Sequence, residues 1–177
     1  MSRQGWHGLG LGVLAGLWLA LAPAAAGAAG EGDWNRQDDP LLEGIGLHAG
    51  KIGGTGLASK FPLQWWLYGQ VAGGIWHTGD NRRHNVGLSL QYLLRQSGTM
   101  RVFLSTGLGY YYHKEKLDFA DAPDRYKVHD TWNTGFGVGV EMLRKERFSL
   151  QIEGDFTHES DDGSFLFFPQ VGVFYYF

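Results

Sequence analysis

The triplet His158-Glu159-Ser160 places a potential general base two residues before a potential nucleophile. In an extended strand successive side chains alternate between faces, so His158 and Ser160 would share one side. A neighbouring imidazole can take the proton of a serine hydroxyl and activate it for attack on an ester carbonyl. The triplet is therefore the sharpest hint of enzyme chemistry in the sequence. A solvated acidic turn is the alternative interpretation.

Histidines and carboxylates also gather in the polar segments of the chain. Imidazole together with carboxylate suits zinc, copper or nickel, but the spacing here contains no short ligand motif. We therefore expect solvated side chains, with no metal and no other cofactor. The residues concerned are His77, His84, His113, His129 and His158, together with Asp80, Glu159, Asp161 and Asp162.

Four charged residues occupy positions that alternate with large apolar ones: Arg101, Glu141, Glu153 and Asp155. Charges on an enclosed face of a β-structure must pair or stay hydrated. Arg101 and Glu141 fall near the same end of their segments, so we expect an ion pair. The charges would also suit a water path, but we favour an interior filled with side chains.

The composition excludes several classes of protein. The chain has 177 residues with 28 Gly, 5 Pro and no Cys, which predicts one domain and excludes disulfides and thiolate chemistry. A formal net charge of −3 disfavours a nucleic-acid partner. The mean hydropathy of −0.22 disfavours a bundle of transmembrane helices.

Residues 1–28 are typical of a cleaved signal peptide. One Arg and no acidic residue precede an apolar stretch at 9–22, and small residues follow it. The tripeptide Ala26-Gly27-Ala28 predicts cleavage after Ala28, with Ala26 as the rival site. The apolar stretch is shorter than the ~20 residues of a spanning helix, which argues against an N-terminal membrane anchor.

Beyond this segment the apolar residues recur with period two. In 132–142, for example, large apolar residues alternate with Asn, Gly and Glu. A long apolar face opposite a small or polar face predicts strands of a membrane barrel with a narrow lumen. A soluble sandwich would place its large side chains inside. Aromatic residues near the strand ends predict two interfacial girdles, formed by Trp65, Trp76, Tyr92, Tyr110, Tyr112, Trp132, Phe148 and Tyr175.

We expect eight strands. Six are clear from the alternation, at 63–74, 85–94, 100–112, 132–142, 148–157 and 164–177. The segment 43–61 would be about 56 Å long as one strand, so we divide it around Ile52-Gly53-Gly54. This gives strands near 43–51 and 55–61. The expected organisation is a periplasmic segment at 29–42 and a barrel at 43–177.

The predicted connections alternate between short and long, which is typical of outer-membrane barrels with short periplasmic turns. The short turns are expected at 61–64, 95–99 and 143–147, and the longer polar loops at 75–85, 113–131 and 157–164. Pro169 removes a ladder donor from the last strand, and we expect a bulge there.

Read back from Phe177 in steps of two, the last strand is apolar as far as Phe165. This strand resembles the C-terminal signature of bacterial outer-membrane proteins, which the barrel-assembly machinery recognises. Over 43–177 the architecture resembles the small eight-stranded barrels of the OmpA transmembrane-domain and OmpX type. The resemblance implies an all-β, antiparallel up-and-down transmembrane barrel in the outer membrane of a Gram-negative bacterium. It also implies a monomer in contact with outer-membrane lipid and lipopolysaccharide.

The His-x-Ser element looks like that of the lipid A 3-O-deacylases, which implies His158 as base and Ser160 as nucleophile. The chain departs from that family at Asp161, where Asn is common, and at 164–168, which lacks an acidic residue. Asp161 or Asp162 would have to replace that acid. We favour a structural or surface-interaction role through 75–85 and 113–131 rather than an enzyme. The deacylase is the alternative, and a small pore comes third.

Overall fold

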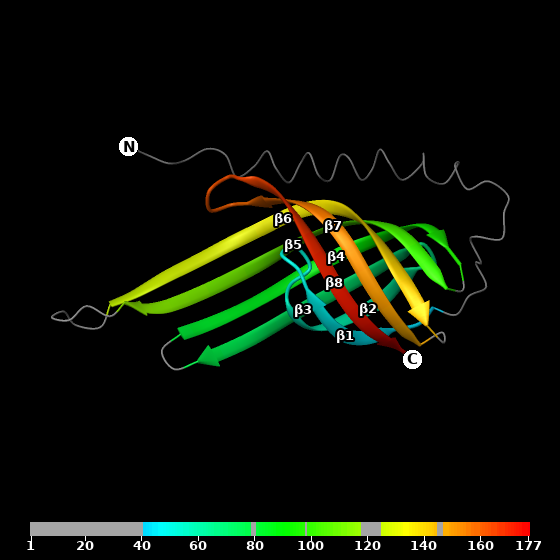
Figure 1. The fold of residues 1–177 in the computed structure, drawn as a ribbon, viewed down its shortest axis with the longest axis horizontal. Coiled ribbons are helices and arrows are strands. Elements are labelled where there is room, and N and C mark those ends of the chain that lie inside the picture. The colour runs from blue at the N-terminus through cyan, green and yellow to red at the C-terminus, as the bar shows by residue number, and fades with distance from the viewer. Residues whose placement is uncertain (1–40, 79–80, 98, 118–124, 145–146) are drawn as a thin grey trace. The chain divides into compact units, whose positions relative to one another are not determined.

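Eight antiparallel strands, each hydrogen-bonded to the next in chain order, form a closed barrel (Figure 1). The last strand pairs with the first, with Gly44 opposite Tyr176, and this pairing closes the wall. The predicted all-β up-and-down barrel is therefore confirmed. The strands are β1 (Gly44–Ala49), β2 (Gly56–Gln64), β3 (Leu67–Thr78), β4 (Asn81–Gln96), β5 (Met100–Leu117), β6 (Arg125–Arg144), β7 (Phe148–Glu159) and β8 (Phe165–Tyr176).

This computed structural model describes residues 41–78, 81–97, 99–117, 125–144 and 147–177. The predicted signal peptide at 1–28 and all but the end of the segment 29–42 lie outside these ranges. Within them, no helix is both long enough and apolar enough to cross a membrane. We call the end of the barrel near Gly44 and Tyr176 the terminal end, and the end with the β3–β4, β5–β6 and β7–β8 turns the hairpin end.

The large apolar residues face outward, as their period of two predicts. In β7, Phe148 and Ile152 are exposed, whereas Gln151 and Asp155, at positions of the other parity, are buried. β8 follows the same rule from Pro169 to the terminal end, whereas the large apolar residues Leu166 and Phe168 occupy inward positions nearer the hairpin end. This is the reverse of a soluble sandwich, so the outer surface presents an apolar belt around a mostly polar interior.

Two of the predicted long loops are mostly strand. β3 and β4 stay paired as far as Thr78 and Asn81, and β5 and β6 as far as Leu117 and Arg125. The expectation of loops at 75–85 and 113–131 is therefore wrong over most of their length. Polar residues there continue the pairing beyond the apolar belt, because backbone hydrogen bonds extend a strand whatever its hydrophobicity.

The first predicted turn is also displaced. Phe61 and Pro62 belong to β2, opposite Gly69 and Tyr68, so the turn falls after Gln64 rather than at 61–64. The β2–β3 register shifts between Pro62 and Gln64. Proline cannot donate a ladder hydrogen bond, which accounts for an irregularity at this point.

The predicted bulge at Pro169 is absent from the described pairing, because the β7–β8 register runs past the Gly154–Pro169 pair without a shift. β1 reaches β8 only as far as Val171. Pro169 therefore lies where β8 has a strand on one side only. The missing N–H is tolerated at such an edge.

The connection between β1 and β2, residues 50–55, turns into the barrel and is called here the inward segment. Its presence confirms the division of 43–61 around Ile52-Gly53-Gly54. Gly54 and Gly56 have φ values of 85° and 134°, which favour glycine and allow the chain to reverse. Ile52 is only 2% exposed, and side chains at Gly107 or Gly135 would collide with it.

Candidate functional site

Glu141 is the centre of a buried polar network inside the barrel. Lys60 Nζ lies 2.9 Å from Glu141 Oε2, and Arg101 Nη1 lies 3.6 Å from the same oxygen. The hydroxyls of Ser149 and Tyr176 donate hydrogen bonds of 2.6 and 2.5 Å to Oε1. The expected Arg101–Glu141 pair is confirmed. Lys60, which sequence analysis missed, is the nearer cation.

The network continues toward the hairpin end through amides and carboxylates. Gln151 accepts a hydrogen bond from Lys60 at 3.1 Å and donates one to Glu153 at 3.0 Å. Asp155 accepts hydrogen bonds from Ser105 and Gln170. The expected inward orientation of Glu153 and Asp155 is confirmed. Side chains therefore fill this stretch of the lumen, as a narrow eight-stranded barrel favours.

The inward segment is held across the lumen by polar contacts to several strands. The imidazole of His48 donates from Nδ1 to the carbonyl of Gly54 at 2.7 Å, and the amide of Thr55 donates to Asn85 Oδ1 at 2.6 Å. The Tyr111 hydroxyl donates to the carbonyl of Gly50. These bonds fix the segment as an internal plug.

Lys51 of the inward segment forms an ion pair with Glu159 of β7. Its ammonium group also lies 3.9 Å from the centroid of the Phe168 ring of β8. Lys51 thus joins the plug to two strands of the wall.

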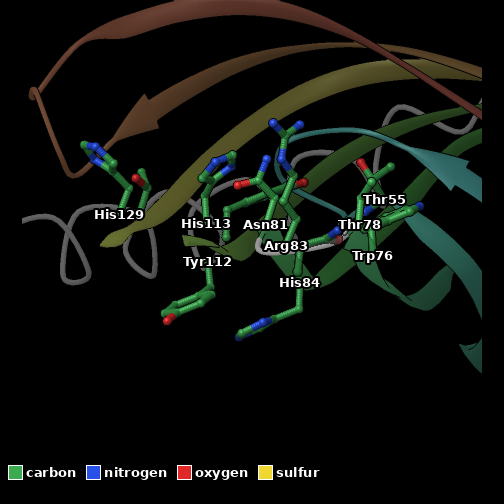
Figure 2. Close-up of a pocket in the computed structure, with 12 residues that line it drawn as sticks. Thr55, Trp76, Thr78, Asn81, Arg83, His84, Tyr112, His113 and His129 are labelled. Carbon is green, nitrogen blue, oxygen red and sulfur yellow. Dashed lines mark hydrogen bonds between the residues drawn. The ribbon is translucent and has the colours of Figure 1, made fainter. Parts of the chain in front are cut away.

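A cavity of about 700 Å³ opens above the inward segment at the hairpin end. It is lined by Thr55, Trp76, Thr78, Asn81, Arg83, His84, Asn85, Tyr111, Tyr112, His113, His129 and Thr131. We call it the outer cavity. Figure 2 shows Arg83 and His113 pointing to one side of the wall, and His84 and Tyr112 pointing to the other.

Four residues form one cross-strand row on the inner face of this cavity. Trp76 of β3 pairs with Arg83 of β4, Arg83 with His113 of β5, and His113 with His129 of β6. Side chains alternate between the two faces of a strand, and in each of these strands the four residues occupy positions that face the interior. A guanidinium group beside two imidazoles and an indole can bind an anion that carries an apolar portion.

Trp76 was expected in an interfacial girdle, but it faces inward and lies over Gly74. The expectation is wrong because β3 continues into the segment taken for a loop. The alternation that places Gln70 and Ala72 in the interior, where both are buried, also places Trp76 there. Tyr110 and Trp132 do pack together on the outer face, with ring centroids 5.0 Å apart.

His158 lies at an outward position of β7, with its ring centroid 5.6 Å from that of Phe165. The Ser160 hydroxyl accepts a 3.0 Å hydrogen bond from the amide of Trp132. Among the residues described, no hydrogen bond connects His158 with Ser160 or with a carboxylate.

Asp162, one of the two acids considered as a partner for His158, has a different role. Its Oδ1 accepts a 2.8 Å hydrogen bond from the amide of Ser164. The hydrogen bonds from Ser164 lower the pKa of the Asp162 carboxyl below its usual value. The carboxylate therefore stabilises the β7–β8 turn. Elsewhere in the described ranges, no group of three His, Asp or Glu side chains could hold a metal ion.

Sequence analysis missed Lys60, Trp76 and Arg83 as interior residues. The period of two contained the signal for Trp76 and Arg83, because Trp76 lies an even number of residues after the buried Gln70, and Arg83 an even number before the buried Gln91. Because 75–85 is polar, it was taken for a loop, and the alternation of inward and outward side chains was not extended through it.

Comparison with solved structures gives the N-terminal β-barrel domain of Pseudomonas aeruginosa OprF, with a TM-score of 0.52 and 16% sequence identity over 77% of this chain and 95% of that chain. The fold is that of a small outer-membrane β-barrel. Two other similar structures are a major outer membrane protein from Thermus thermophilus (TM-score 0.48, 15% identity, 77% and 99% coverage) and the Yersinia pestis outer membrane protein Ail (0.41, 11%, 78% and 100%). No family model and no curated protein matches the sequence.

Proposed function

We propose that this chain is an outer-membrane protein whose barrel is closed to passage and displays the hairpins β3–β4 and β5–β6 at the cell surface for contact with other molecules. The filled lumen carries this proposal. Lys60, Glu141 and Gln151 bridge the wall near the terminal end, and the inward segment bridges it further up. A filled lumen favours an anchor over a pore.

The hairpins supply the surface for such contacts. On β6, Tyr126 and Val128 are exposed beyond the apolar belt, and the ammonium group of Lys114 lies 3.9 Å from the Tyr126 ring centroid. Tyrosine is among the residues enriched at protein–protein interfaces. The charged residues around Tyr126 and Val128 indicate that this part of the hairpin lies in water rather than in lipid.

The absence of cysteine makes the orientation testable with single introduced thiols. Lys127→Cys lies on the β5–β6 hairpin and Thr99→Cys in the turn between β4 and β5. A membrane-impermeant maleimide added to intact cells should label Lys127→Cys and should label Thr99→Cys only after permeabilisation. The reverse pattern would contradict the proposal.

Two further measurements separate an interaction role from a pore. The purified barrel in a planar bilayer should give no stable ohmic conductance, whereas regular current steps would favour a pore. A photo-crosslinking amino acid at Tyr126 should capture a discrete partner in living cells. The same residue at Met142, in the apolar belt near the terminal end, is the matched control and should not capture it.

A further inference from the structure

β1 and β2 stop well short of the hairpin end of the barrel. Figure 1 shows both as short strands beside the longer β8 and β3. The last β1–β8 pair is Ala49 with Val171, and the last β2–β3 pair is Leu57 with Gly73. Beyond these pairs, residues 165–170 of β8 and 74–78 of β3 have no strand beside them on that side within the described chain. Two strands are missing from this part of the wall, a width of about 10 Å.

This lateral gap lies at the depth of the apolar belt. The outward row of β8 runs from Phe165 to Tyr175, which spans about 25 Å along the barrel axis at ordinary rise and tilt. That height matches a whole apolar belt, and Val171 lies near its middle. Phe165 and Phe167, 60% and 59% exposed, therefore border the gap in the half of the belt nearer the hairpins. The gap therefore opens toward the lipid acyl chains on the hairpin side of the belt.

Leu166 and Trp76 make the walls of the gap apolar on their inner face, and the Phe168 ring lies against the Lys51 ammonium group. Leu166 and Phe168 of β8 and Trp76 of β3 occupy inward positions, and Leu166 and Trp76 are each 44% exposed. Inward positions elsewhere on β7 hold Ser, Gln, Glu, Asp and Thr. The change from polar to apolar on the inner face produces an apolar path from the belt into the outer cavity.

This apolar path ends beside the guanidinium group of Arg83. Trp76 is the register partner of Arg83, and Arg83 is the partner of His113. An apolar entrance that ends at a guanidinium group and an imidazole is complementary to a molecule with an acyl chain and an anionic head. A second copy of the chain would cover the strand edges, but it would leave Arg83 and the inner face of Leu166 without a partner.

From these observations we propose that the lateral gap between β3 and β8 binds an anionic membrane amphiphile, with its acyl chain between Leu166 and Trp76 and its headgroup at Arg83. The source of the amphiphile is the lipid leaflet on the hairpin side. The assignment of that leaflet as the outer one rests on the proposed function. The binding chemistry itself does not depend on it.

Trp76 provides the probe. Trp34, Trp65, Trp66 and Trp132 are replaced by Phe in the mature chain, which is then placed in phosphatidylcholine nanodiscs containing phosphatidylglycerol with brominated acyl chains. Bromine quenches indole fluorescence only on close approach, and Trp76 faces away from the bulk lipid. We expect clear quenching of Trp76 by brominated phosphatidylglycerol. Absence of quenching would overturn the proposal.

Two neighbouring arginines test the headgroup. Arg83→Gln should raise the brominated phosphatidylglycerol needed for half-quenching by about tenfold, the usual effect of losing one charge-assisted hydrogen bond. Arg82→Gln is the matched control, because Arg82 lies on the outer face of the same strand, and it should leave that amount unchanged. Equal quenching by brominated phosphatidylcholine would overturn the proposal, since the headgroup would then have no role.

Leu166→Asp tests the path by placing a charge in the apolar gap, and it should abolish quenching. A heat-dependent gel shift verifies that each variant is folded. An Ile75→Cys variant that forms disulfide dimers, together with an unquenched Trp76, would assign the gap to a second copy and overturn the proposal. Both ends of the barrel are accessible in nanodiscs, so the quenching result does not depend on the orientation measured by maleimide labelling in cells. The amphiphile proposal and the surface-display proposal can therefore fail separately.

Discussion

Lys60 and Glu141, 81 residues apart in the sequence, form a 2.9 Å ion pair across the closed lumen. Neither side chain is more than 1% exposed. The rings of Tyr68, Phe103 and Phe174 surround the ammonium group at 5.4–5.8 Å from their centroids. A lysine in such surroundings depends on its carboxylate partner, because water cannot replace it.

Replacing this lysine should destabilise the barrel strongly. In Lys60→Met, Glu141 would keep Arg101 as its only cationic partner among the described residues. Losing one member of a buried pair costs about 3–5 kcal/mol, so we expect a loss near the lower limit. Urea unfolding in lipid vesicles, followed by tryptophan fluorescence, measures the effect.

Lys127→Met is the matched control for this experiment, because Lys127 is exposed on the hairpin β5–β6. It should change the free energy of unfolding by less than about 0.5 kcal/mol. Equal losses in the two variants would contradict the role of the buried pair.

Ile52 should anchor the inward segment. Ile52→Ala removes apolar contacts from a side chain that is 2% exposed, and such truncations cost about 2–5 kcal/mol. The same urea titration measures the loss. Ile152→Ala, at a lipid-facing position that is 50% exposed, is the matched control and should cost clearly less. The reverse order would mean that the plug does not contribute to stability.

The contacts of His158 and Ser160 predict that lipid A stays intact. The Ser160 hydroxyl is bonded to the amide of Trp132, and no described hydrogen bond orients His158. Mass spectrometry of lipid A from cells that express the wild-type chain should therefore match that from cells with Ser160→Ala. Loss of one acyl chain with the wild type alone would instead establish the deacylase.

The β7–β8 turn should respond to acid through Asp162. Hydrogen bonds from Ser164 lower the pKa of this carboxyl in the folded chain. The stabilisation is therefore complete above the unfolded pKa of about 3.9 and is lost as the pH falls through the lower folded pKa. The amide chemical shift of Ser164 should titrate with a midpoint below about 3.9.

Asp162→Asn should abolish that titration, whereas the neighbouring Asp161→Asn should preserve it. A midpoint at or above the unfolded pKa would show that the hydrogen bond does not favour the ionised form.

The barrel was predictable because one local rule, the period of two, holds along every long strand. It assigns Ile152 outward and Gln151 inward without knowledge of any partner. Strand ends are different, because they depend on which distant segment supplies a hydrogen-bonding partner. The pairing of Thr78 with Asn81 extends a polar hairpin that composition alone assigns to a loop.

The site was harder to predict for the same reason. Arg101 and Glu141 were recognisable as a pair because they lie near the same end of adjacent strands. Lys60 reaches Glu141 from across the lumen, and no spacing along the chain encodes that contact. Trp76 and Arg83 become partners only once β3 and β4 are known to continue past the apolar belt.

The short first strand also determines how the barrel would respond to force. β1 joins β8 through six residue pairs, whereas β5 and β6 share eighteen. β1 has only five residue pairs with β2 on its other side, so the first strand is weakly held along both edges. Under a steady pull on the N-terminus, β1 should therefore detach first. The remaining strands would then unzip in chain order, with the largest resistance at the β5–β6 hairpin.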